Sequence, residues 1–279
     1  MKRIVTIQDI SCLGKCSLTV ALPIISAMGV ETAVIPTAVL STHTMFQNFT
    51  CRDLTDEITP ISQHWIKEGF QFDGIYTGYF GSVEQIGIVK QFFNQFKTDQ
   101  NLIFVDPVMA DNGKLYPSFD LNFVQEMAGL CAAADIIVPN LTEACLMTGT
   151  EYRTNYDEAY VKELLGRLKA LGTRKAVVLT GVNLNSKKTG VVGMFTESGD
   201  YFSYDHEKVD TNYHGTGDIF SSATVGALMN GRNLMDSLKI AADYTVECIK
   251  ATQIDGKKTW YGVNFETVIP KLLHALEKW

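Results

Sequence analysis

The sequence predicts an α/β fold: a three-layer αβα sandwich with a mostly parallel central sheet and an antiparallel edge. Short apolar runs alternate along the 279 residues with segments of helical period. Most of these runs are followed by small or polar residues, as is usual at the carboxyl ends of parallel strands. Two strand-like segments flank Glu197–Asp200, a turn sequence typical of a hairpin. Because no linker, low-complexity tract or internal repeat interrupts the chain, we expect residues 1–279 to form a single domain.

The predicted elements follow in chain order from their apolar patterns. Residues 4–7 are typical of a buried strand, and residues 17–28 form a helix with Leu18, Leu22, Ile25 and Met28 on one face. The same criteria predict further strands at residues 32–40, 74–77, 102–105, 136–138 and 176–179, and hairpin strands at 190–195 and 201–205. They predict further helices at residues 83–96, 121–130 and 158–171, after Asp218, and near 236–253 and 266–277.

The composition excludes several classes of protein. Apolar residues make up 46% of the chain and charged residues 20%, which favours a folded core over disorder. The net charge of -7 argues against a nucleic acid or an anionic membrane as partner. No apolar run is long enough to span a bilayer, and the run at residues 4–7 is too short for the core of a signal peptide. The six cysteines are dispersed without zinc-ligand spacing, so we expect reduced thiols in a cytoplasmic protein.

The most informative segment is Asp-Thr-Asn-Tyr-His-Gly-Thr-Gly-Asp at residues 210–218, directly before an apolar helical pattern. A helix N-terminus presents unpaired N–H groups and partial positive charge. Gly215 and Gly217, on either side of Thr216, lack the side chains that would keep an anion away from those groups. Asp218 follows where a carboxylate can take a proton from a hydroxyl group that attacks a bound phosphate. A plain turn in which Asp218 caps the helix is the competing interpretation.

Polar residues also follow most of the predicted strands. Ligands bind along the carboxyl edge of the strands in open α/β sheets. We therefore expect one crevice lined by residues 215–218 together with Asp9, Tyr79, Asp106, Asp111, Asn140, Glu143 and Thr180. Helix capping is the competing role for the acidic residues of this group. The sequence has no P-loop, no dinucleotide-binding glycine motif after the first strand and no nucleophile elbow, so the phosphate chemistry must use another arrangement.

These motifs resemble those of the ribokinase-like superfamily, and within it the pyridoxal kinase branch. The second signature of the superfamily is similar to residues 210–218, in which Gly-Thr-Gly-Asp is intact. The segments that resemble the branch cover most of the chain in the expected order, and they are Ile7–Gln8, Ser41–Thr44, Thr77–Tyr79, Asp106–Met109 with Asp111 and Tyr116, Ala134–Ile137 with Pro139–Asn140 and Glu143, and Thr148–Gly149.

The resemblance implies a kinase that moves the γ-phosphoryl group of ATP to the 5′-hydroxymethyl group of pyridoxal, pyridoxamine or pyridoxine. It implies that Asp218 is the base and that Gly215, Thr216 and Gly217 form the anion hole. It also implies Mg²⁺ as cofactor, K⁺ as a further candidate ion, and a homodimer. The residues implied to serve Mg²⁺ and the nucleotide are Asp106, Asp111, Asn140, Glu143 and Thr180. Those implied to line the substrate pocket are Asp9, His43, Thr44, Tyr79 and Asp218.

Some positions depart from the pattern of vitamin B6 kinases. Asp9 stands where those kinases usually carry serine, the loop at 10–16 matches poorly, and Val138 stands where threonine is common. A carboxylate beside the ring pocket would favour a positively charged vitamer, so Asp9 predicts a preference for pyridoxamine or for the ring-protonated form of vitamin B6. The competing interpretation is that Asp9 binds amides of its own loop near Gly14.

The departures leave two other functions open. One is a hydroxymethylpyrimidine kinase of thiamin synthesis, because such kinases are close relatives of the B6 kinases. The other is a catalytically silent protein that binds a B6 vitamer or a nucleotide. The intact Gly-Thr-Gly-Asp at residues 215–218 argues against the silent protein, since a binder needs no base.

Overall fold

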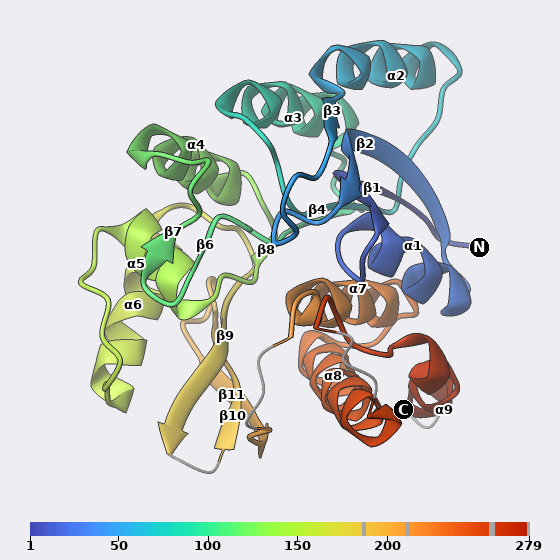
Figure 1. The fold of residues 1–279 in the computed structure, drawn as a ribbon. Helices are drawn as coiled ribbons and strands as arrows, with labels where there is room; N and C mark the ends of the chain where they lie inside the picture. The colour runs from blue at the N-terminus through green and yellow to red at the C-terminus, as the bar shows by residue number, and fades with distance from the viewer. Residues whose placement is uncertain (186–187, 210–212, 257–259, 278–279) are drawn as a thin grey trace. The chain divides into compact units, whose positions relative to one another are not determined.

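The computed structural model describes residues 1–185, 188–209, 213–256 and 260–277 (Figure 1). Contacts between Cα atoms divide the chain into two compact units. Unit 1 comprises Met1–Gly74 and Val209–Trp279, and unit 2 comprises Ile75–Lys208. The expectation of a single domain over residues 1–279 stays a prediction.

Unit 1 contains the strands β1 (Arg3–Leu13), β2 (Glu31–Thr42) and β3 (Cys51–Asp53), in the order β1-β2-β3. β1 and β2 are parallel, and β3 runs antiparallel to β2. The register of β1 shifts between Gln8 and Ile10, which marks an irregularity at Asp9. The expectation that the first strand ends before Asp9 is therefore wrong. The strand continues through polar residues because pairing with β2 extends to Leu13.

The helices of unit 1 are α1 (Leu18–Ala27), α2 (Thr55–Lys67), α7 (Thr216–Met229), α8 (Leu234–Asp255), the 3-10 helix η1 (Glu266–Val268) and α9 (Ile269–Glu277). α7 packs against both α1 and α8. Every residue from Ile219 to Ala227 in α7 is buried, rather than one face alone. Small residues permit this close approach: a Cβ added to Gly226 would overlap the side chain of Met28.

In the part of unit 2 that the structure describes, six strands share the large sheet in the order β4-β5-β8-β9-β10-β11. They are β4 (Gly74–Thr77, whose first residue belongs to unit 1), β5 (Leu102–Val105), β8 (Ile136–Ile137), β9 (Ala176–Asn185), β10 (Lys188–Phe195) and β11 (Tyr201–Glu207). β5, β8 and β9 are parallel, whereas β10 and β11 form the predicted antiparallel hairpin beside β9 (Figure 1). β9 is longer than predicted and contains Thr180, because β10 pairs with it there.

The helices of unit 2 are α3 (Val83–Phe96), α4 (Leu121–Ala132), α5 (Leu141–Thr148) and α6 (Glu158–Ala170). A small ribbon of β6 (Ala110–Asp111) and β7 (Lys114–Leu115) precedes α4. The prediction of an α/β fold with a mostly parallel sheet, flanking helices and an antiparallel edge is confirmed. Within the described ranges, none of the helices combines the length and the apolar character that crossing a bilayer requires.

Candidate active site

The glycine loop at the start of α7 is the candidate anion site. Gly215 is the N-cap residue and adopts the left-handed conformation, with φ 79° and ψ 0°. Because the N-cap residue is a glycine, it has no side chain that could cap the helix and compete with an anion for the first-turn amides. Residues 210–212 of the motif lie outside the described part of the chain.

The two glycines of the loop have different surroundings. A Cβ added to Gly215 would overlap the backbone carbonyl of Lys15, so the space beside this residue is already filled. A Cβ added to Gly217 would meet no atom within 4 Å. The expectation that both glycines leave room for an anion therefore agrees with the geometry at Gly217, whereas Gly215 serves the turn and the packing.

Asp218 lies in the first turn of α7 and is partly exposed. Burial and the charge of Asp218 raise the pKa of the nearby Cys16 thiol to about 12, and Asp9 adds to this effect. The structure therefore brings the two acids predicted for this site close to one thiol. Because that thiol stays protonated near pH 7, it is not available to take a proton from a hydroxyl group.

Asp9 is 4% exposed and bonded to its own chain. Its Oδ1 atom accepts a hydrogen bond from the Ser17 hydroxyl at 2.5 Å, and Oδ2 accepts one from the Ser11 hydroxyl at 3.3 Å. Burial raises the pKa of Asp9, and the two serine hydroxyls oppose that rise. The backbone amide of Asp9 is a further donor to its carboxylate, and the contact with amides near Gly14 that the competing interpretation expects stays a prediction.

His43 and Thr44 follow β2 at a cluster of aromatic rings. The ring of His43 lies 4.9 Å from Phe46, 5.1 Å from His214 and 5.8 Å from Trp260, measured between centroids. Burial and the neighbouring His214 lower the pKa of His43, which favours a neutral ring near pH 7. The structure thus joins the segment around His43 to the glycine loop, while the side chain of Thr44 is exposed.

In unit 2, Asn140 and Glu143 form a capping box at the start of α5. The Asn140 side chain accepts a hydrogen bond from the Glu143 amide at 3.0 Å, and Glu143 Oε2 accepts one from the Asn140 amide at 2.9 Å. Asn140 also donates to the carbonyl of Ala110 at 2.8 Å, and Glu143 Oε1 accepts from the amide of Met109 at 3.2 Å. Both side chains therefore connect α5 to the residues around β6, whatever further role they have.

The pKa of Glu143 is strongly perturbed. Burial and the nearby carboxylate of Asp106 raise the pKa of Glu143 well above 4.5, against the amide donors that favour its ionised form. Asp106 is itself only 7% exposed. Two buried acids that interact in this way are a common feature of functional sites, although ion-pair networks also produce such shifts.

The other site residues predicted in unit 2 are Thr180, Tyr79 and Asp111, and only Thr180 is described beside Asn140. Thr180 lies next to Asn140, with which it forms an isolated β-bridge, and its amide donates to the carbonyl of Pro139 at 3.0 Å. Tyr79 packs instead near Phe119, at 5.6 Å between ring centroids. Asp111 is exposed, and its carboxylate accepts from the amide and the side chain of Asn112 at 2.8 and 2.9 Å.

The described residues contain no group of three or more His, Cys, Asp or Glu side chains that could hold a metal ion by themselves. Mg²⁺ at phosphoryl-transfer sites usually keeps several waters and takes one or two carboxylates together with the substrate phosphates. The pair of Asp106 and Glu143 fits this second arrangement, because it supplies carboxylate oxygens close together in a buried place.

Sequence reasoning missed the short loop at Gly14–Ser17, which packs against Gly215. No local sequence pattern predicts that contact, because it joins residues far apart in the chain. The spacing of Asn140 and Glu143 did contain a usable signal, since Asn-x-x-Glu before an apolar run is typical of a capping box.

The chain is similar to known kinases over most of its length. A family model described as phosphomethylpyrimidine kinase matches residues 21–263. A pyridoxine/pyridoxal/pyridoxamine kinase from Bordetella avium (strain 197N) is 27% identical over 266 residues, covering 90% of this chain and 86% of that protein.

Two solved structures extend the similarity to the whole fold. One is a protein from Bacteroides thetaiotaomicron, provisionally assigned as a phosphomethylpyrimidine kinase and crystallised in an orthorhombic form with pyridoxal. It is 38% identical with a TM-score of 0.91, and the match covers 97% of this chain and 95% of that one. The other is a pyridoxal kinase from Lactobacillus plantarum, which is 29% identical with a TM-score of 0.91 over 100% of this chain and 99% of that one.

Proposed function

Because this chain belongs to the phosphomethylpyrimidine kinase family, in the pyridoxal kinase branch of the ribokinase-like superfamily, we propose that it phosphorylates the 5′-hydroxymethyl group of a vitamin B6 vitamer with ATP. The observation that carries the proposal is the start of α7. There a left-handed Gly215, an open space at Gly217 and the carboxylate of Asp218 follow one another within four residues. A site that binds the transferred phosphoryl group and a base that receives the proton of the hydroxyl group are two parts that this reaction uses.

The proposed roles follow from charge and position. Asp218 takes the proton of the attacking hydroxyl group. The amides of Gly215, Thr216 and Gly217 stabilise the negative charge that develops on the transferred phosphoryl group. Phosphoryl transfer depends on positioning and charge neutralisation more than on covalent chemistry. Amides and a carboxylate are groups of the type that can supply both.

Asp106 is the residue that we propose to hold Mg²⁺, with Glu143 as its electrostatic partner. Bound Mg²⁺ would supply positive charge to the phosphates of ATP. Glu143 already accepts amide hydrogen bonds on both of its oxygens, so we assign it mainly to the geometry of α5. A magnesium titration of the rate tests this division. Asp106→Asn should need more Mg²⁺ for half-maximal rate than Glu143→Gln, and the reverse order would exchange the two roles.

Support for a B6 vitamer comes from the relatives. The Bordetella avium protein is a kinase of all three vitamers by name, and the Bacteroides thetaiotaomicron protein was crystallised with pyridoxal. The family description favours the alternative, a kinase of a hydroxymethylpyrimidine. Both substrates present a hydroxymethyl group on a nitrogen-containing aromatic ring, so one site chemistry serves either.

The test is ADP release by the purified protein with Mg-ATP and, separately, pyridoxal, pyridoxamine, pyridoxine or hydroxymethylpyrimidine, with the phosphorylated product identified by mass. Transfer to any vitamer above the Asp218→Asn background supports the proposal. Transfer to hydroxymethylpyrimidine alone establishes the alternative. Binding of pyridoxal in calorimetry without turnover of any of the four compounds would establish a silent binder.

A further inference from the structure

The loop Gly14–Ser17, here called the support loop, lies directly against the start of α7. The carbonyl group of Lys15 fills the space where a side chain on Gly215 would lie, and the Cα atom of Cys16 is beside it. Gly215 therefore rests on backbone atoms of the support loop. A displacement of that loop would be passed directly to Gly215, because close-packed atoms transmit strain.

Ser17, the last residue of the support loop, is held in an unusual conformation. Its φ of 51° and ψ of -136° lie in a region that residues other than glycine rarely adopt. Ser17 is also the N-cap residue of α1, but its side chain makes no capping hydrogen bond. A serine at this position usually accepts a bond from an amide of the first turn. Here its hydroxyl donates to Asp9 instead.

Asp9 is suited to hold Ser17 in place. Its carboxylate is buried, and its neighbours Gln8 and Ile10 on β1 both pair with β2. It accepts the hydroxyls of both Ser17 and Ser11, and a buried carboxylate needs such donors to offset the loss of water. Asp9 thus connects the rigid sheet of unit 1 to the strained end of the support loop.

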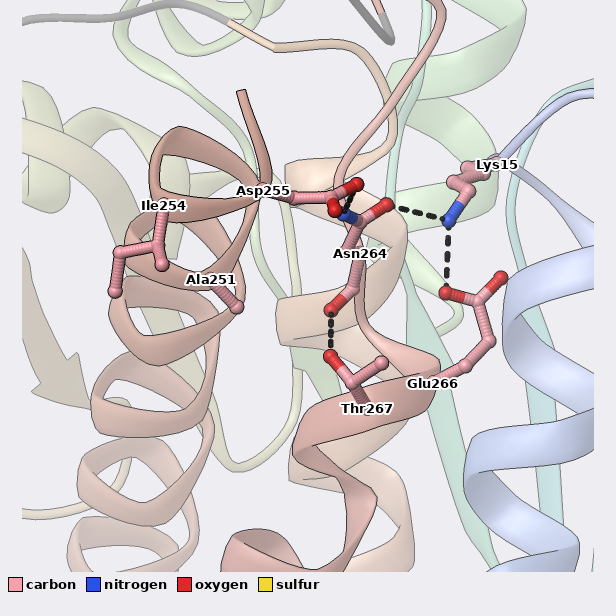
Figure 2. A pocket seen from close by; sticks show the side chains of 7 residues that line it. All are labelled: Lys15, Ala251, Ile254, Asp255, Asn264, Glu266 and Thr267. Carbon is pink, nitrogen blue, oxygen red and sulfur yellow. Dashed lines mark hydrogen bonds and ion pairs between the residues drawn. The ribbon is translucent and has the colours of Figure 1, made fainter. Parts of the chain in front are cut away.

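Lys15 connects the support loop to residues near the C-terminus through an ion pair and a hydrogen bond. Figure 2 shows the Lys15 ammonium between Glu266, at 2.8 Å, and the Asn264 side chain, at 3.1 Å. These residues border a cavity of about 630 Å³. On this side the loop is held by these polar contacts and by the close packing of Lys15 against Gly262, where an added Cβ would overlap the Lys15 side chain. The Asp9–Ser17 bond holds the opposite end of the loop.

We propose that Asp9 is a positioning residue for phosphoryl transfer: through Ser17 it fixes the support loop, and through the Lys15 carbonyl it fixes Gly215. The inference rests on the proposed function, because it concerns the anion hole of that reaction. It gives Asp9 a role without contact to the vitamer. A misplacement of about 1 Å near a reacting group can cost roughly 10²-fold in rate.

Steady-state kinetics on the full chain separate positioning from substrate binding. Asp9→Ala and Ser17→Ala should lower kcat at least about tenfold while KM for the vitamer stays within about threefold, the pattern of an interaction used in the transition state. Asp9→Asn should rescue the rate, since its amide oxygen still accepts from Ser17. A raised KM with unchanged kcat in Asp9→Ala would show contact with the vitamer and overturn the proposal.

Two further variants control for stability. Ser237→Ala removes an equally buried serine hydroxyl, which donates to the Asn233 carbonyl at the start of α8, and it should leave kcat unchanged. Ser17→Gly removes the hydroxyl but relieves the strained φ, so it should fold well and still lose rate as Ser17→Ala does. Full activity in a folded Ser17→Gly protein would contradict the proposal.

A readout that needs no substrate keeps this inference separate from the proposed function. In protein labelled with ¹⁵N-glycine, the amide resonance of Gly215 should shift in Asp9→Ala and Ser17→Ala but not in Ser237→Ala. An unchanged Gly215 resonance in both variants would overturn the positioning role. If the wild type phosphorylates no compound, the proposed function fails, and the resonance of Gly215 still decides whether Asp9 positions it.

Discussion

Replacement of Gly217 by alanine should stabilise the protein and inhibit it at the same time. Gly217 lies in the first turn of α7, has no positive φ, and has no atom within 4 Å of the position of an added Cβ. Alanine is better than glycine inside a helix by about 0.5–1 kcal/mol, and the first turn should give roughly the lower of these values. The same methyl group would occupy the open space proposed for the anion, so turnover should fall at least about tenfold.

Two matched variants sharpen this prediction. Gly166→Ala places the same methyl group in α6, where Gly166 is also exposed and has an open Cβ position, so it should gain similar stability without loss of turnover. Gly215→Ala should lose stability, because its left-handed φ costs alanine about 1–2 kcal/mol and the overlap with Lys15 adds about 1–3 kcal/mol.

The assays are urea unfolding and ADP release on the same preparations. A Gly217→Ala protein that keeps full turnover would refute the assignment of the open space to the anion. A loss of stability in that variant would refute the steric reasoning itself, since the added methyl group meets nothing.

Three other substitutions test the charges. Asp218→Asn should fold normally and lose about 10²–10⁴-fold in kcat, the usual contribution of a positioned base, and a rate within threefold of the wild type would remove it from that role. The raised pKa of Glu143 means that its contribution to stability is complete below pH 4.5 and is lost as pH rises through the folded-state pKa. Glu143→Gln should therefore flatten the fall in unfolding free energy above pH 4.5, and an unchanged slope would argue against the shift. Burial tends to raise the pKa of Asp135, but hydrogen bonds from Arg174 and Lys97 outweigh it and hold the pKa below 3.8. Its contribution is present above pH 3.8 and lost as pH falls through the lower folded-state pKa, so Asp135→Asn should cost about 1–3 kcal/mol at pH 7 and much less in strong acid, measured by urea unfolding at both pH values.

The elements predicted best are those whose pattern is short-range and strong. The strands at 74–77 and 102–105 and the helix at 83–96 have the predicted bounds, because apolar periodicity and a helix cap determine them locally. The helix α2 was not predicted, since Pro60 lies inside it and its apolar positions are few. Strand ends were predicted too early at Asp9 and Thr180, because pairing with a neighbouring strand, rather than apolarity, extends β1 and β9.

The candidate site was predictable where a motif is continuous and unpredictable where contacts are distant. The segment at 215–218 has its expected place at the start of α7, and its catalytic role stays a prediction. The packing of Lys15 on Gly215 and the bond from Ser17 to Asp9 join residues separated in the chain, and no periodicity encodes such pairs.

The burial of residues 219–227 of α7 separates the positions that can vary in such an enzyme from those that cannot. A larger side chain at Ser222 or Gly226 would have to displace neighbouring helices, so random mutagenesis should recover few active variants there. Thr44 and Trp260, by contrast, are exposed near the ring of His43, and exchanges at these positions leave the scaffold intact. Selection for a new acceptor molecule would therefore accumulate changes around residues 44 and 260 while the sequence of α7 stays nearly constant.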